Sequence, residues 1–309
     1  MTDLSSKLVI PTPAAMAAAT EDAMLAKATK PWFEMFLLSL TGGAFIALGF
    51  IFFVTSQQGL GAPFPVGPAK VLGGVVFSVG LMLVVVSGSD LFTGTTMTVM
   101  PLLSKRLGAG RWLGHWVVSL VGNFIGSVVV ALLVLWAGTP SSNKSAWGLV
   151  VLNATLGKVT LTWGHAFFLA ILANFAVCLA VWMANSGRST ADKILAIVGP
   201  IALFVASGFE HSVANMFMLP MGWLVKNFAP DSFWQGEAIT KAGVTLETFA
   251  AITPGAIVFD NLIPVILGNI VGGAVFVGVY FWACYIRPAR KAAAEAPAAV
   301  ADTEATPGR

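Results

Sequence analysis

The chain has 309 residues, of which 57% are hydrophobic and 10% are charged, and its mean hydropathy is +0.85. This composition excludes a soluble globular domain and indicates a protein that crosses a membrane several times. A formal net charge of +3 gives no sign of nucleic acid as a partner.

Residues 1–31 form the first predicted region. They lack the apolar core of a signal peptide, and residues 16–30 alternate Ala and Met with charged side chains. That pattern predicts an amphipathic helix on the cytoplasmic membrane surface.

Residues 32–287 form the predicted membrane domain. A helix needs about 20 apolar residues to cross a hydrocarbon core of about 30 Å. Six stretches meet this length, near residues 32–56, 70–105, 112–137, 160–186, 194–227 and 255–286. The second and fifth are too long and too interrupted for single spans, so each is predicted as two half-helices. Both cysteines lie within spans, where packing is the expected role.

The chain changes character after Arg287. Residues 288–309 are rich in Ala and Pro with scattered charges. Such a segment buries too little apolar surface to offset the entropy lost on ordering, so we predict a disordered cytoplasmic tail.

A short polar phrase interrupts both long spans: residues 86–90 (VSGSD) and 206–211 (ASGFEH). Exposed backbone and charge are costly in hydrocarbon, so matching interruptions in two halves predict a solute site made of broken helices. Gly-Asn follows in the same order, at residues 122–123 and 268–269. With three spans per half, the second half enters from the opposite face, which predicts an inverted 3+3 repeat. The longer loop at 231–253 is expected outside the cytoplasm.

Lys and Arg predict the orientation of the six spans. Twelve of these residues fall on the side of the termini and five on the other. By the positive-inside rule, both termini lie in the cytoplasm.

Polar side chains at the breaks suit a small anion. Half-helices that start inside the membrane present N–H groups with partial positive charge. His211 is the one histidine in a break, and it can donate to an anion, attract it when protonated, or relay a proton. Asp90 and Glu210 follow the breaks directly, and we interpret both as caps of the new helix starts.

Large apolar residues flank each break. Phe77 and Leu81 share one helical face before the first break, and Phe204 lies one turn before the second. Their spacing alone leaves two interpretations open: constrictions of a pore or packing between helices.

Residues 206–217 (ASGFEHSVANMF), 91–93 (LFT), 260–264 (DNLIP) and 267–269 (LGN) resemble the signature stretches of the formate/nitrite transporter family, in particular its formate-channel branch. The resemblance covers residues 11–287. It implies an all-α, aquaporin-like protomer of six membrane helices within a homopentamer, with one pore per protomer and a gating role for the N-terminal helix.

The resemblance also implies roles for individual residues. Phe77, Leu81 and Phe204 are then pore constrictions, and Thr93 and His211 are the central polar pair. Asn174 and Asn269 are then lumen-lining or His-supporting groups.

The expected function is bidirectional transport of formate and similar monovalent anions across the bacterial inner membrane, passive or proton-coupled. A nitrite or hydrosulfide channel of the same family is one alternative. A membrane-embedded redox enzyme is a remote one, since the three histidines lack ligand spacing. No enzymatic activity, metal or cofactor is expected.

Overall fold

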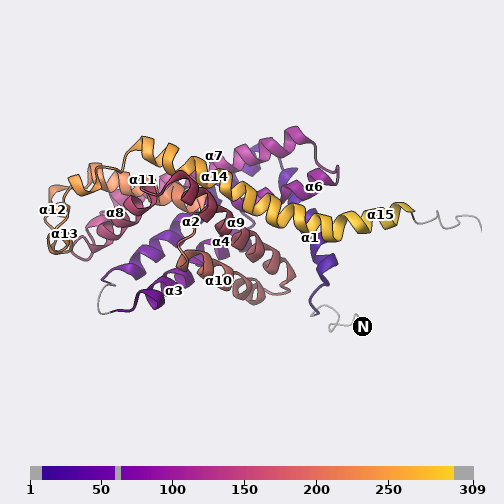
Figure 1. The fold of residues 1–309 in the computed structure, drawn as a ribbon, viewed down its shortest axis with the longest axis horizontal. Helices are drawn as coiled ribbons and strands as arrows, with labels where there is room; N and C mark the ends of the chain where they lie inside the picture. Colours follow the sequence, from indigo (N-terminus) through magenta and orange to yellow (C-terminus); the bar gives the residue numbers. More distant parts are fainter. Residues whose placement is uncertain (1–8, 60–63, 296–309) are drawn as a thin grey trace, which may run out of the picture.

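The structure is a computed structural model that describes residues 9–59 and 64–295, and within these residues every regular element is a helix and there is no strand. Figure 1 shows the elongated bundle. The first half comprises α1 (Pro13–Ala28), α2 (Trp32–Gln57), α3 (Val66–Phe77), α4 (Val79–Ser87), α5 (Phe92–Thr95), η1 (Thr96–Thr98), α6 (Val99–Leu103) and α7 (Ala109–Trp136).

The second half begins at a short turn. It comprises η2 (Thr139–Ser141), α8 (Ala146–Val159), α9 (Trp163–Ser186), α10 (Thr190–Ala206), α11 (Ser212–Phe228), α12 (Asp231–Trp234), α13 (Glu237–Ala242), η3 (Glu247–Phe249), η4 (Ala256–Leu262), α14 (Ile263–Ile270), η5 (Val271–Val279), η6 (Trp282–Ile286) and α15 (Arg287–Glu295). The elements from η4 to α15 form one helix of 40 residues.

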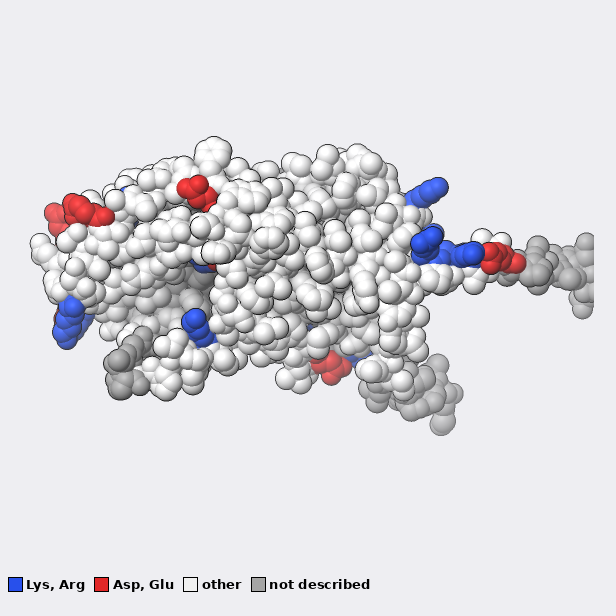
Figure 2. Space-filling view, in the orientation of Figure 1, with Lys and Arg blue, Asp and Glu red and all other residues white. Residues whose placement is uncertain are grey.

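The prediction of six spans with the second and fifth broken is confirmed. In the described part of the chain, five helices are long and apolar enough to cross a membrane: Trp32–Gln57, Val66–Ser87, Ala109–Trp136, Trp163–Ser186 and Ala256–Glu295. The remaining span consists of α10 and α11, each 17 residues long. Figure 2 shows most charged side chains toward the two ends of the long axis, as expected for a bundle with an apolar middle.

Glycines bring the spans of each half into close contact. A Cβ on Gly126 of α7 would lie 2.0 Å from the carbonyl oxygen of Leu40, and one on Gly272 would lie 2.2 Å from that of Ile171. Small residues at a helix interface let two backbones approach closely, which favours helix association in a membrane, where there is no hydrophobic driving force between helices. The same device therefore joins α2 to α7 and α9 to the sixth span.

Helix α1 differs from its prediction. We expected a helix on the membrane surface, but α1 packs across one end of the bundle, against α6, α9 and η6. Its buried side chains follow one helical face: Ala17, Thr20, Glu21, Met24 and Ala28. We name this end of the molecule the α1 face and the opposite end the α13 face.

Two other boundaries also differ. Helix α8 was not predicted, because its 14 residues are too short to span a membrane. The predicted disordered tail was wrong for residues 288–295, which continue the last helix as α15; residues 296–309 lie outside the described part.

Candidate functional site

Two glycines end the helices at the breaks. Gly88 follows α4 with φ +76°, and Gly208 lies beyond α10 with φ +71°. This left-handed conformation favours glycine, which has no Cβ to clash with the carbonyl. The chain thereby leaves each helix, and α5 and α11 begin afresh inside the membrane.

Asn123 on α7 holds the start of α5. Its Oδ1 accepts the N–H of Phe92 at 2.7 Å, and its Nδ2 donates to the carbonyl oxygens of Ser39 and Asp90 at 2.7 and 2.9 Å. The amide is fully buried. It therefore satisfies the N–H of Phe92 and the carbonyl of Asp90, which lie in the break and would otherwise lack partners in hydrocarbon, and it joins them to α2.

Asn269 repeats this arrangement at the start of α11. Its Oδ1 accepts the N–H of Ser212 at 2.8 Å, and its Nδ2 donates to the carbonyl oxygens of Ala170 and Glu210 at 2.8 and 3.0 Å. The equivalence of all three bonds supports the inverted repeat. It also shows that the prediction for Asp90 and Glu210 was wrong: among the described residues no backbone N–H at these helix starts donates to either carboxylate. The asparagine amides hold both starts, and Nδ1 of His211 also caps α11.

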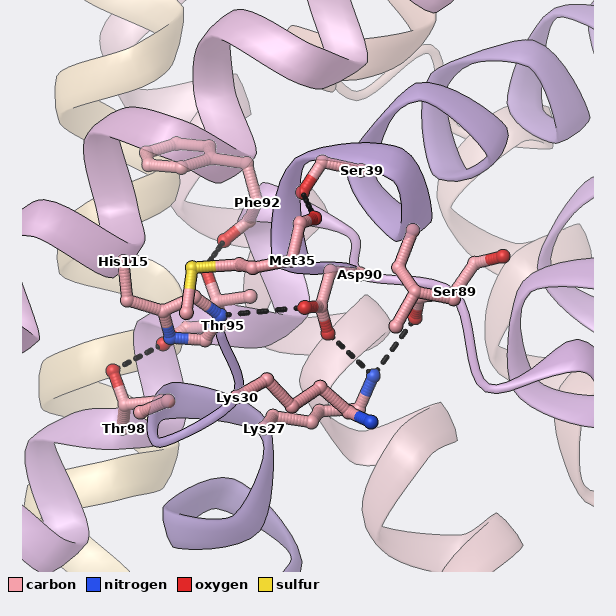
Figure 3. Close-up of polar contacts among 12 residues, drawn as sticks. Lys27, Lys30, Met35, Ser39, Ser89, Asp90, Phe92, Thr95, Thr98 and His115 are labelled. Carbon is pink, nitrogen blue, oxygen red and sulfur yellow. Dashed lines mark hydrogen bonds and ion pairs between the residues drawn. The ribbon is translucent and has the colours of Figure 1, made fainter. Parts of the chain in front are cut away.

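A lysine on α1 neutralises Asp90 instead (Figure 3). The Nζ of Lys27 donates to Asp90 Oδ1 at 2.7 Å and to the carbonyl oxygens of Ser89 and Gly88 at 2.8 and 3.3 Å. The other carboxylate oxygen lies 3.6 Å from Nε2 of the buried His115. A buried acid thus ties α1 to the first break.

Glu210 is held by more partners. Lys158, from the end of α8, donates to its Oε1 at 2.6 Å. The side-chain amides of Asn215 and Asn261 donate to its Oε2 at 2.6 and 3.1 Å. Both carboxylate oxygens are therefore occupied, and this acid is part of the scaffold.

Three cavities in series run between the two faces. A vestibule of about 570 Å³ opens on the α13 side, and Figure 2 shows the molecule hollowed there; a chamber of about 10 Å³ lies in the middle, and a second vestibule of about 130 Å³ lies beneath α1. Phe77 and Phe204 line both the large vestibule and the chamber. Leu81 and Leu91 line both the chamber and the small vestibule. His211 also lines both the large vestibule and the chamber. These five residues separate the cavities, and Leu91 was not predicted from sequence.

The chamber is narrow and almost wholly apolar. Its other walls are Ile46, Val177, Ile201 and His211. A volume of this size holds about one water molecule. The rings of Phe77 and Phe204 meet edge to face, with centroids 5.7 Å apart. A solute of three heavy atoms therefore passes only when side chains move.

His211 has a tautomer fixed by its neighbours. Its Nδ1 accepts the N–H of Ala214 at 3.1 Å, so the ring proton lies on Nε2, 2.9 Å from Oγ1 of Thr93. The imidazole is neutral in this arrangement and donates to Thr93. Thr93 is fully buried and lies behind His211, outside the linings of the three cavities.

Asn174 stands one layer further back. Its Nδ2 lies 3.1 Å from the carbonyl oxygen of Thr93, 3.2 Å from Oγ1 of Thr96 and 2.6 Å from the carbonyl oxygen of Asn269. Neither Asn174 nor Asn269 lines any of the three cavities. Of the two roles implied for them, the geometry matches support of the central pair and not lumen lining.

The internal repeat contains a signal for the residues that sequence reasoning missed. Lys27 and Lys158 each lie five residues before a tryptophan that opens a span, Trp32 and Trp163. In the structure, each lysine forms an ion pair with the acid at the break of its own half, Lys27 with Asp90 and Lys158 with Glu210. Because Lys27 belongs to α1 and Lys158 to α8, these two helices are equivalent elements of the repeat. Alignment of the two breaks likewise pairs Leu91 with His211.

The other histidines lie apart from the chamber, His115 beside Asp90 and His165 in the first turn of α9. Across residues 9–59 and 64–295, no group of three or more His, Cys, Asp or Glu side chains is arranged to hold a metal ion.

Comparison with known proteins places this architecture in a family. The chain is 45% identical to "Formate channel FocA" of Escherichia coli K12 over 275 residues, covering 89% of this chain and 94% of that protein. It is 42% identical to "Formate channel FocA" of Haemophilus influenzae over 255 residues, covering 82% and 87%. It is 40% identical to "Probable formate transporter" of Methanothermobacter thermautotrophicus over 279 residues, covering 84% and 92%.

Solved structures agree. The fold matches "Pentameric formate channel with formate bound" with a TM-score of 0.75 at 36% identity, covering 82% of this chain and 98% of the other. It matches "FNT family ion channel" with a TM-score of 0.70 at 30% identity, covering 87% and 97%. The family model "Formate/nitrite transporter" matches residues 14–283. The chain therefore belongs to the formate/nitrite transporter family, whose members are membrane channels and transporters.

Proposed function

We propose that this protein conducts formate and similar small monovalent anions in both directions across the bacterial inner membrane, through one pore in each protomer of a homopentamer. The observation that carries the proposal is a single polar side chain, His211, inside an apolar chamber between two vestibules. The printed names of the relatives, formate channels among them, support the choice of solute.

Charge distribution supports a cytoplasmic location of both termini. Of the fifteen Lys and Arg residues in the described part, ten lie toward the α1 face and five toward the α13 face. The positive-inside rule then orients the α1 face to the cytoplasm.

In the proposed mechanism, formate enters the chamber beside His211 and reaches Thr93, which lies behind the ring, as the side chains move. The Nε2–H of His211 and the hydroxyl of Thr93 are donors that lie 2.9 Å apart, so the carboxylate replaces their mutual bond with two bonds to itself. The apolar rings on either side exclude bulk water and hydrated cations.

The hydrogen bond by which Nδ1 of His211 caps α11 limits proton transfer from this ring to formate. If His211 is to transfer a proton to formate, it must first become imidazolium with a proton on Nδ1. That nitrogen then no longer accepts the N–H of Ala214, and a helix start inside the membrane loses its bond. The geometry therefore favours hydrogen-bond donation by the neutral ring, and proton transfer occurs only with local rearrangement of α11.

Two substitutions test these roles by formate flux into proteoliposomes across a pH series. His211→Phe removes the donor, and we expect formate flux to fall by at least about 100-fold, equivalent to about 2.7 kcal/mol of barrier. His211→Asn keeps an N-cap acceptor for Ala214 and a side-chain N–H donor but cannot titrate. We expect it to retain flux that no longer depends on pH.

The outcomes separate the alternatives. Unchanged flux in His211→Phe would contradict the assigned role of His211. Competition between formate, nitrite and hydrosulfide in the same assay distinguishes the proposed function from the nitrite or hydrosulfide channel. We expect Thr93→Ala, which removes one donor, to weaken anion selection by a smaller factor than His211→Phe weakens flux.

A further inference from the structure

We infer that Lys70 and Lys193 are the anion-recruiting residues of the two vestibules, an inference that rests on the proposed function. Each lines one vestibule, and neither forms an ion pair or side-chain hydrogen bond with any residue in the described part of the chain. The other lysine of each vestibule is already neutralised by the acid of a break.

The vestibule on the α13 side contains Lys70, Lys158 and Glu210 as its charged lining residues. Lys158 and Glu210 are 2.6 Å apart and form a pair, so their combined field falls off steeply with distance. Lys70, near the start of α3, has an exposed side chain. The net positive charge of this vestibule therefore comes from Lys70.

The vestibule beneath α1 also contains two lysines, although no acid in the described part of the chain lines it. Lys27 and Lys193 are its charged lining residues. All three N–H bonds of the Lys27 ammonium are used, by Asp90 and by two backbone carbonyls. Lys27 can bind an anion only if it gives up a hydrogen bond to the first break, whereas Lys193 has no side-chain hydrogen bond to lose in the described part of the chain.

One acid lies close to Lys193 along the chain. Asp192 accepts the backbone N–H groups of Arg188 and Ser189 and caps the start of α10. Its carboxylate is exposed, where solvent and salt screen its charge. The net effect on the vestibule is positive, since Lys193 lines it and Asp192 does not.

The two lysines lie near the starts of equivalent helices, although they are not paired by the repeat itself. Lys70 lies in the first turns of the helix that opens the second span, and Lys193 lies in the first turn of the helix that opens the fifth. These helices start at opposite faces, so each mouth of the pathway has one lysine without an ion-pair partner among the residues that the structure describes. An unpaired charge at a mouth raises the local concentration of counter-ions and the rate of capture.

Initial rates of formate flux from each face of oriented proteoliposomes test the inference. At about 10 mM ionic strength, where the Debye length is about 30 Å, we expect Lys193→Gln to lower the rate from the α1 face by about 3- to 10-fold. Lys70→Gln should do the same from the α13 face. Both losses should shrink at about 1 M salt, where the Debye length is about 3 Å, and Lys193→Arg and Lys70→Arg should restore the rates.

Matched controls are Lys105→Gln near the α1 face and Lys241→Gln at the α13 face, which line neither vestibule. The inference is overturned if the vestibule variants behave like these controls, or if arginine fails to rescue while the protein stays assembled. Failure of the wild-type protein to carry formate would instead overturn the proposed function. In that case nitrite or hydrosulfide flux through the same variants still tests the two lysines.

Discussion

The first break presents Leu91 to the central chamber, and the second break presents His211 from the corresponding position. Three features around this pair are duplicated: a left-handed glycine, an asparagine that holds the new helix start, and an acid at the break (Asp90 or Glu210) that pairs with a lysine. The duplication thus supplies the scaffold, and a single unequal position supplies the chemistry. In the proposed mechanism, one polar residue in the chamber wall is enough to bind a small anion without making the passage hydrophilic.

The two asparagines should be equally indispensable if the scaffold is symmetric. Asn123→Leu and Asn269→Leu each remove three hydrogen bonds and leave two buried backbone groups of a break, one N–H and one carbonyl, unpaired, at a cost of about 1–3 kcal/mol per group. We expect both variants to lose assembled protein in detergent, measured by size-exclusion chromatography after heating. If one variant assembles normally, the two breaks are not equivalent.

The lysine partners should differ in importance. Lys27→Met removes the one hydrogen-bonding side chain of Asp90 in the described part, whereas Lys158→Met leaves Glu210 with two amide donors. Removal of one partner of a buried pair costs about 3–5 kcal/mol when nothing replaces it. We therefore expect the thermal unfolding midpoint to fall further in Lys27→Met. Equal shifts would contradict the asymmetry between the two acids.

The position at which the two breaks differ, Leu91 in one and His211 in the other, can also be tested by a substitution of the leucine. Leu91→Ala enlarges the chamber without touching His211 or its bonds. We expect a rise of a few-fold in flux of acetate relative to formate, because a hydrophobic pocket discriminates one methyl group by only about 10- to 200-fold. Val86→Ala, on the same span outside the chamber, is the control.

The smallest effect is expected at an exposed cluster of Glu237 with two lysines. Hydrogen bonds from Lys144 and then from Lys241 lower the pKa of Glu237 from 4.5 to about 2. A depressed pKa contributes stability above pH 4.5 that is lost as the pH falls toward 2. Because the group is exposed, we expect Glu237→Gln to change the melting temperature barely at pH 7 and not at all near pH 2. A large change at pH 7 would show that this loop supports the bundle.

The sequence alone predicts those site residues that interrupt an apolar span with a small or polar side chain. Gly88, Gly208 and His211 stand out because polar and small residues are costly in a span. Leu91 does not stand out, since an apolar residue that lines a pore has the same composition as one that packs against a neighbour. The packing of α1 was missed because its alternation of Ala, Met and charge fits a membrane surface and a protein surface equally.

The equivalence of α1 and α8 changes how the N-terminal segment should be handled in experiments. Deletion of residues 1–31 is an obvious way to ask whether α1 obstructs the small vestibule. It would also remove the lysine that neutralises Asp90 and leave a bare carboxylate at the mouth of an anion pathway. A truncated protein could then reject anions by repulsion although its mouth is wider, and the two effects separate only if Asp90→Asn accompanies the deletion.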